Sequence, residues 1–442
     1  MKLKPYPEYR DSGIKWIGEI PEGWEVRKIK HFSKLFTGST PDSGNEKYWD
    51  GNITWVTPAD LSVQQKFIKE SKRTISHEGH INSGTNFVNV GAIILATRAP
   101  IGYPTIVGTK LCFNQGCKAF EIKKDIISDY AYYFLDVYID VLISKGNTTT
   151  FGELSTYDLA SFPLLKPPLP DQTTIISFLD KRTARFDALI EKDKRLIALL
   201  KEKRTALINH AVTKGLNPNA KMKRVTHDLI EKIPENWDIL ALKHIVSRKI
   251  TDGPHETPDF LDNGIPFISA EAIKQDKIDF TKMRGYISEE LHKIYCTKCK
   301  PKKDDVFLVK SGATTGNVAI VQSDEEFSIW SPLALIRSDK QKLLPKLLYY
   351  ILLSDYFKKT VELSWSFGTQ QNIGMGVIEN LNIIVPEIKE QKILLEILGK
   401  QTSKIDITIQ KINEKITLLE EYKKSLIHHV VTGKVDVRKS EV

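Results

Sequence analysis

The 442-residue sequence predicts an α+β fold in which two β-rich regions are joined by two long antiparallel helices. Residues 171–212 return without a gap as residues 390–431. In both stretches apolar residues recur at alternating spacings of three and four, as in a coiled coil. Short β-rich runs, broken by Gly, Pro, Asn and Asp, fill the region before each stretch. The chain is therefore predicted to be a tandem duplication with a pseudo-twofold axis.

The start of each β-rich region is duplicated as well. Ile20-Pro21-Glu22-Gly23-Trp24 returns as Ile233-Pro234-Glu235-Asn236-Trp237, and Lys30-His31 returns as Lys243-His244. We interpret the two tryptophans as core residues that mark equivalent positions. The predicted segments are a first globular domain at 1–165, a long helix at 166–216, a second domain at 217–385 and a second long helix at 386–442.

Within the two globular regions the order of predicted elements is the same, although the sequences differ. A helix is expected at 128–143 and at 344–359, where Tyr132-Tyr133 match Tyr349-Tyr350. The predicted strands of both copies are 53–56, 92–95, 104–107, 119–122, 266–268, 306–309, 318–321 and 334–336. A shared scaffold with different contents suits recognition of two different targets.

The long helices are each too long for an ordinary globular helix. At about 1.5 Å per residue, roughly 42 residues give a rod of about 60 Å, which needs a partner along its length. The other copy is the simplest partner; the alternative is two unrelated helices, each packed on its own domain. The predicted seam contains Ile175, Leu179, Phe186, Leu189, Leu196, Leu200, Leu207, Leu394, Leu398, Ile405, Ile412, Leu419, Tyr422 and Leu426.

Composition restricts the function without fixing it. The formal net charge of +9 and the pI near 9.0 favour a polyanionic partner, although a merely basic protein would show the same excess. No apolar run approaches a membrane span and the amino terminus is polar, so a cytoplasmic location without membrane association is expected. Cys296 and Cys299 resemble half of a metal site, but the duplicate lacks such a pair, so structural thiols and no bound metal are expected.

Loops in both globular regions carry side chains that hydrogen-bond to bases and phosphates. Arg and Lys match guanine edges, Asn and Gln match adenine edges, and Ser, Thr and exposed amides suit phosphates. The alternative for any one of them is a turn residue chosen for its backbone. The DNA-binding candidates are Thr37, Ser39, Thr40, Thr97, Arg98, Asn147, Thr148, Thr149, Lys249, Thr251, His255, Lys310, Ser311, Thr314, Asn317, Gln370, Gln371 and Asn372.

Motifs of common catalytic sites are missing from the sequence. The loop 312–317 contains glycines but has neither the spacing nor the lysine of a phosphate-binding loop. A dinucleotide-binding turn, a His-Glu-x-x-His metal motif and the Asn-Pro-Pro-aromatic motif of amino-methyltransferases are absent too; Lys166-Pro167-Pro168-Leu169 does not replace the last of these. We therefore interpret the chain as a binding protein rather than an enzyme.

The sequence resembles the DNA specificity subunits of type I restriction-modification systems over nearly its whole length. The resemblance rests on the stretch 11–24, on Pro167-Pro168-Leu169-Pro170-Asp171-Gln172 before the first long helix, and on the stretches 178–187 and 207–215. The second copy departs from it, with Val385-Pro386-Glu387 where the first has the double proline.

This resemblance implies two target recognition domains, each reading half of an interrupted, asymmetric sequence in double-stranded DNA. The long helices would set the spacer and dock two methyltransferase (modification) subunits, with Leu196, Leu200, Leu207, Ile412, Leu419 and Leu426 as docking candidates. The partners would supply S-adenosylmethionine, and restriction/translocase subunits would supply ATP- and Mg²⁺-dependent chemistry. No cofactor is expected in this chain.

Two alternatives belong to other classes. A single-chain restriction-methylation enzyme would need its own catalytic motif. A sequence-indifferent nucleic-acid-binding coiled-coil scaffold would bind random DNA as tightly as any chosen site, whereas a true reader prefers its site by roughly 10³ or more.

Overall fold

The protein forms two compact units, each assembled from one β-rich region and parts of both long helices. The computed structural model describes residues 4–63, 65–98, 100–123, 125–146, 152–274, 276–364 and 372–440. Unit 1 comprises Met1–Asp193 and Glu414–Val442, and unit 2 comprises Lys194–Asn413. The long helices are α7 (Leu169–Lys214) and α12 (Ile388–Val431), which confirms a long helix over each of the repeated stretches 171–212 and 390–431; α12 ends well before the predicted boundary at residue 442.

The β-rich part of unit 1 is built around a five-stranded sheet in the order β4-β11-β8-β9-β6. It also contains a three-stranded sheet in the order β10-β5-β7. Its elements are β1 (Tyr9–Asp11), β2 (Glu19–Pro21), β3 (Glu25–Lys28), α1 (Ile29–Phe32), β4 (Ser33–Thr37), η1 (Glu46–Tyr48), β5 (Trp49–Val56), α2 (Pro58–Leu61), β6 (Phe67–Ile68), β7 (Thr74–Ile75), α3 (His77–Ser83), β8 (Ile93–Ala96), β9 (Gly102–Val107), β10 (Cys112–Phe113), β11 (Cys117–Ile122), α4 (Ser128–Val137), α5 (Ile139–Gly146), α6 (Thr156–Ser161) and β12 (Pro163–Lys166).

Unit 2 repeats this plan with a four-stranded antiparallel sheet, β16-β24-β21-β22, and a three-stranded sheet, β20-β17-β23. Its elements are β13 (Met222–Arg224), β14 (Lys232–Pro234), β15 (Asp238–Ala241), η2 (Leu242–His244), β16 (Thr251–Asp252), β17 (Ile265–Ile268), η3 (Ala270–Ala272), β18 (Ile273–Lys274), β19 (Lys277–Ile278), η4 (Phe280–Lys282), β20 (Gly285–Ile287), α8 (Glu289–Lys298), β21 (Val306–Val309), β22 (Val318–Ile320), β23 (Ser328–Ile329), β24 (Leu333–Ile336), α9 (Pro345–Leu353), α10 (Asp355–Leu363), α11 (Met375–Asn380) and β25 (Asn382–Val385).

A buried glutamine at the start of each long helix joins it to the preceding domain. Gln172 accepts a hydrogen bond from the N–H of Ile127 at 2.8 Å and donates to the carbonyls of Asp125 and Pro167. Gln391 makes the same three contacts with Leu344, Lys342 and Pro386. Each amide thus satisfies backbone groups that would be costly to bury unpaired, and each fixes the direction in which its helix leaves the domain.

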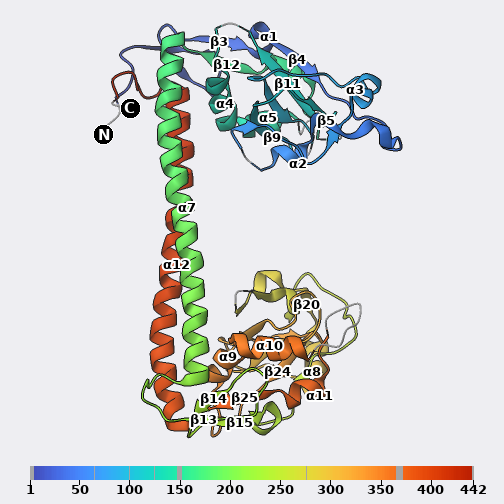
Figure 1. Ribbon diagram of the computed structural model, residues 1–442, viewed down its shortest axis with the longest axis vertical. Helices are drawn as coiled ribbons and strands as arrows, with labels where there is room; N and C mark the ends of the chain where they lie inside the picture. The colour runs from blue at the N-terminus through green and yellow to red at the C-terminus, as the bar shows by residue number, and fades with distance from the viewer. Residues whose placement is uncertain are drawn as a thin grey trace. The chain divides into compact units, whose positions relative to one another are not determined.

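The helices pair antiparallel within each unit. In unit 1 the first part of α7 lies beside the last part of α12 (Figure 1), and Asp187 and Asp193 of α7 form ion pairs with Lys423 and Lys415 of α12. In unit 2 Arg204 of α7 pairs with Asp406 of α12 at 3.0 Å. The pairs Asp187–Lys423 and Asp406–Arg204 occupy equivalent positions of the duplicated sequence, so the structure confirms the internal repeat.

Two sequence-based details of the helices are wrong. The seam residues Leu189 and Leu196 are exposed, and Ile190, the neighbour of Leu189, is buried in its place. Tyr422 of α12 is exposed as well, but its ring contacts that of Phe186 of α7, which agrees with its place in the seam. The single helices expected at 128–143 and 344–359 are each broken into two, at Tyr138 and at Ser354. Asp193 of α7, which is polar, is nevertheless buried, and it is ion-paired with Lys415 of α12.

Candidate nucleic-acid interface

In unit 1 two of the predicted loops start from the same edge of the five-stranded sheet. β4 ends at Thr37, opposite Lys118 of β11, and β11 begins at Cys117, opposite the last residue of β8, Ala96. The antiparallel pairing therefore places the end of β4 and the end of β8 at the same edge, on either side of the start of β11. These two strand ends and the segments after them contain five of the candidates, namely Thr37, Ser39, Thr40, Thr97 and Arg98.

Three of these candidates present polar groups at the surface, and a fourth is half-buried. Thr37 and Thr40 are exposed, and the hydroxyl of Thr40 donates to the side chain of Gln115. Half of the Arg98 side chain is exposed. Ser39 is half-buried, and its N–H donates to the carbonyl of Phe113 at 3.1 Å. DNA contact by these four residues stays a prediction.

The fifth candidate, Thr97, is wrong as a direct DNA contact. Its exposed fraction is zero, and its hydroxyl donates to the carbonyl of Gly116 while it receives a hydrogen bond from Lys118. A side chain without accessible surface cannot reach a phosphate or a base. Thr97 instead joins the end of β8 to the start of β11.

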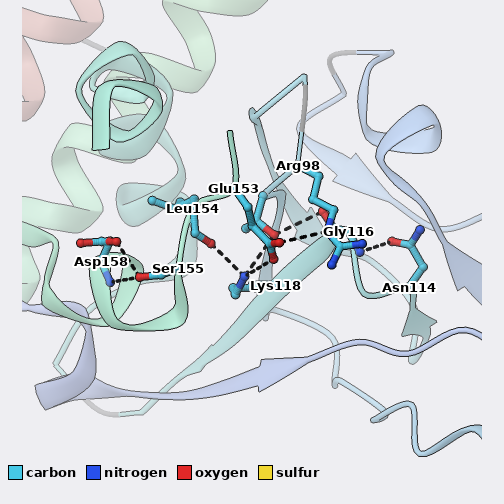
Figure 2. A network of polar contacts seen from close by, with 9 residues as sticks. Arg98, Asn114, Gly116, Lys118, Glu153, Leu154, Ser155 and Asp158 are labelled. Carbon is cyan, nitrogen blue, oxygen red and sulfur yellow. Dashed lines mark hydrogen bonds and ion pairs between the residues drawn. The ribbon is translucent and has the colours of Figure 1, made fainter. Parts of the chain in front are cut away.

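A polar network that the sequence did not reveal lies at this edge. Figure 2 shows Glu153 between Lys118 and Arg98. Lys118 Nζ lies 3.3 Å from Glu153 Oε1, and Arg98 Nε lies 3.1 Å from Glu153 Oε2. Burial acts to raise the pKa of the Glu153 carboxyl, but hydrogen bonds from Lys118 and Arg98 outweigh it and lower that pKa. The one feature of the sequence that could have indicated this network is a lysine within the otherwise apolar run 117–120, which is buried.

Unit 2 presents an equivalent edge with different side chains. β16 ends at Asp252, opposite Ala334 of β24, and β21 ends at Val309, opposite Leu333. The ends of β16 and β21 therefore lie at the same edge, as those of β4 and β8 do in unit 1. Of the candidates in unit 2, Lys249, His255, Asn317 and Asn372 are exposed, whereas Thr251, Ser311 and Thr314 are half-buried.

Asp252, which the sequence-based candidates omitted, is the centre of a charged cluster at this edge. Its buried carboxylate lies 2.6 Å from Lys298 Nζ, 3.2 Å from Lys310 Nζ and 3.3 Å from His255 Nε2. Burial acts to raise the pKa of Asp252, but the two lysines lower it overall. Lys310 is a tenth exposed and neutralises this carboxylate, and DNA contact by Lys310 stays a prediction.

The two edges share one backbone framework. The N–H of Thr97 donates to the carbonyl of Gly116, and the N–H of Lys310 donates to that of Pro332, both at 2.8 Å. The carbonyls of Thr97 and Lys310 in turn accept from the N–H groups of Leu154 and Ile373, again at 2.8 Å. Thr97 and Lys310 are therefore structurally equivalent, as are their neighbours Arg98 and Ser311, and Glu153 and Asn372.

Five candidates fall outside the described residues: Asn147, Thr148, Thr149, Gln370 and Gln371. The described chain resumes at Gly152 and at Asn372, next to the shared framework. Within the described ranges no group of three or more His, Cys, Asp or Glu is arranged to hold a metal ion, and no helix is both long and apolar enough to cross a membrane.

The six docking candidates on the long helices differ in exposure. Leu196 is 44% exposed, whereas Leu200, Leu207, Leu419 and Leu426 are half-buried. Ile412 is buried, so its side chain cannot contact a partner protein. Exposed apolar residues that were not among the candidates include Leu199 on α7 and Leu418 on α12, with exposed fractions of 52% and 64%.

Comparison with known proteins agrees with this architecture. Residues 21–200 and 234–418 each match the type I restriction modification DNA specificity domain. The type I restriction enzyme MjaIX specificity subunit of Methanocaldococcus jannaschii is 27% identical over 445 residues, which cover 99% of this chain and 98% of that one. The EcoprrI specificity subunit of Escherichia coli is 23% identical, covering 88% of this chain and 90% of its own.

A chain from a solved structure of a type I R-M system has the same fold. Its TM-score is 0.69 at 15% identity, and the match covers 94% of this chain and 99% of that chain. The repeated specificity domain thus accounts for both β-rich regions and for most of both long helices. The chain therefore belongs to the family of type I restriction-modification DNA specificity subunits.

Proposed function

We propose that each unit reads one half of a bipartite, asymmetric sequence in double-stranded DNA, and that this chain directs the other subunits of a type I restriction-modification complex to it. The observation that carries the proposal is the shared framework at the two sheet edges. One backbone arrangement holds Arg98 and Glu153 in unit 1 but Ser311 and Asn372 in unit 2. A common scaffold with different hydrogen-bonding groups is suited to two half-sites of different sequence.

In this proposal the chain binds DNA and contributes no catalytic group. Methylation of adenine would use S-adenosylmethionine held by two modification subunits, and restriction/translocase subunits would use ATP and Mg²⁺. The net charge of +9 favours DNA through release of counterions from the phosphates, whereas the loop side chains provide the discrimination between sequences.

Competition binding tests the reading function against the sequence-indifferent scaffold. The methylome of cells that express the system identifies the target, and the assembled modification complex is then titrated with that duplex and with a scrambled duplex of equal length. The target is expected to bind roughly 10³-fold more tightly or better at moderate salt. Equal affinities for both duplexes would favour the scaffold, and scrambling one half-site at a time shows whether the target is bipartite.

The long helices offer two small apolar surfaces for the modification subunits. Leu196 and Leu199 lie one turn apart on α7 in unit 2, and Leu418 and Tyr422 lie one turn apart on α12 in unit 1. Leu199 and Leu418 occupy equivalent positions of the duplicated sequence. An exposed leucine at the equivalent position of both copies, with a second exposed apolar side chain one turn away in each, favours two copies of one partner.

Changing either leucine to aspartate is expected to remove one modification subunit from the complex, because a carboxylate cannot be buried in an apolar contact without a large desolvation cost. Leu199→Asp and Leu418→Asp should each shift the stoichiometry from two partners to one, and the double variant to none, as measured by native mass spectrometry. Lys201→Asp places the same carboxylate on another exposed face and should retain both partners. Two retained partners in the double variant would exclude these surfaces.

A further inference from the structure

Lys118 is a charged residue in an unusually buried position. It lies in β11 between Thr37 of β4 and Leu95 of β8, and its side chain is 7% exposed. A buried ammonium is costly unless it is both paired and hydrogen-bonded. Lys118 Nζ donates to the carbonyl of Leu154 at 2.8 Å and reaches Glu153 and Thr97 at 3.3 Å. The lysine thereby fixes the segment 153–154 to the edge of the sheet.

Glu153 connects this buried cation to an exposed one. Its Oε1 atom faces Lys118, and its Oε2 atom accepts from Nε of Arg98, which is half exposed (Figure 2). The backbone bond from Leu154 to Thr97 places the carboxylate beside the guanidinium. Both partners of the Arg98–Glu153 pair are thus held by contacts with a buried part of the sheet.

This geometry leaves the outer end of the Arg98 guanidinium available for a ligand. Its Nε is directed to Glu153, and the described residues provide no hydrogen-bond acceptor for its two Nη groups. Two adjacent N–H donors in one plane match the O6 and N7 acceptors of guanine. A guanidinium that is already oriented also loses less rotational freedom on binding than a mobile one.

We propose that Glu153, anchored by Lys118, is a positioning residue that orients Arg98 to read a guanine in the half-site of unit 1. The proposal rests on the reading function proposed above. Unit 2 has Ser311 and Asn372 at the equivalent positions, so the same arrangement does not operate there. The half-site of unit 2 therefore serves as an internal control in every measurement.

The test uses the assembled modification complex, with Glu153→Gln, Arg98→Ala and the double variant compared with the native chain. Glu153→Gln keeps the side-chain shape but removes the negative charge. Discrimination at one guanine of the unit 1 half-site is expected to fall about tenfold in Glu153→Gln and further in Arg98→Ala, at the same position. Competition binding with duplexes that carry each of the four bases at that position gives the ratios.

The double variant separates positioning from a general structural effect. If Glu153 acts through Arg98, Glu153→Gln should cause no further loss of discrimination in the Arg98→Ala background. Glu25→Gln, which removes the charge of another exposed carboxylate paired with an arginine in unit 1, should leave both half-sites unchanged. The half-site of unit 2 should stay unchanged in all four variants.

Three outcomes would overturn the proposal. The first is that Glu153→Gln leaves discrimination at every position unchanged. The second is that it lowers discrimination further when Arg98 is already alanine, and the third is that it weakens both half-sites equally. In each of these cases the native complex still prefers its bipartite target, so the reading function stands and the positioning role fails. A native complex without any sequence preference would instead overturn the reading function itself.

Discussion

Insertion of whole heptads into both long helices is expected to lengthen the spacer of the DNA target by about three base pairs per heptad, with both half-sites unchanged. Seven residues at about 1.5 Å each add about 10 Å to a helix, and one base pair advances the duplex by about 3.4 Å. A heptad nearly preserves the face that each helix turns to its partner, since seven residues rotate that face about the helix axis by only about 20°.

The structure shows where these residues should be inserted. The two units meet in sequence between Asp193 and Lys194 of α7 and between Asn413 and Glu414 of α12. Insertion at both points leaves the ion pairs Asp187–Lys423 and Arg204–Asp406 within their own units. Methylome sequencing of cells that express each variant then reports the spacer and the half-sites separately.

A series of one, two and three heptads makes the prediction sharper. Three heptads add about 32 Å, or about nine base pairs, which is close to the roughly 10 base pairs of one DNA turn. The three-heptad variant should therefore be the most active of the series, because its half-sites return nearly to the original face of the duplex. As a control, seven residues added to the exposed turn at Asp324–Glu325 should leave the spacer unchanged. An active variant with lengthened helices and an unaltered spacer would show that the long helices do not set the spacer.

Trp237→Ala is expected to destabilise unit 2 by about 3–5 kcal/mol, which is the usual cost of removing a large buried aromatic side chain. Trp237 has no exposed surface, and its Nε1 donates to Glu390 at the start of α12 at 2.7 Å. A Cβ atom on Gly215, just after α7, would lie 3.3 Å from the same indole. One side chain therefore supports the end of one long helix and the start of the other.

Hydrogen exchange resolved by peptide measures this effect in each unit, because the chain has two units and one global transition cannot be assumed. Trp237→Ala should lower protection throughout the β-rich part of unit 2 and leave that of unit 1 unchanged. The control Trp330→Ala truncates a half-buried tryptophan of the same unit and should lower the protection of unit 2 clearly less than Trp237→Ala does. If Trp237→Ala lowers the protection of unit 2 no more than Trp330→Ala does, Trp237 does not support the two long helices as described.

The duplication made the architecture predictable from the sequence, whereas the helix register was ambiguous. Leu189-Ile190 and Leu196-Ile197 are adjacent apolar pairs, and either member fits a spacing of three and four. In the structure Ile190 is buried, whereas Leu189 and Leu196 are exposed. The break at Ser354 was hidden because the helix before it, 345–353, is buried apart from Lys346, and its apolar sequence shows no polar face from which to locate its end.

The candidate site was predictable only in outline. Loops rich in Thr, Asn and Lys indicated the correct segments, because such composition is visible locally. The contact between Lys118 and Glu153 joins residues far apart in the sequence. It depends on the backbone hydrogen bond from Leu154 to Thr97, so no local sequence pattern predicts it. The same applies to Asp252 and Lys310, whose proximity depends on two strands separated by a third.

The division of the helices between the units also determines the order in which the protein is completed during synthesis. Unit 2 is continuous from Lys194 to Asn413, whereas unit 1 includes Glu414–Val442. Ile427, Val430 and Val431 are buried in the core of unit 1, and the hydroxyl of Tyr9 donates to the carbonyl of Gly433. The β-rich part of unit 1, which is synthesised first, therefore cannot complete its core until residues 427–433 have emerged from the ribosome, by which time every residue of unit 2 has already been made.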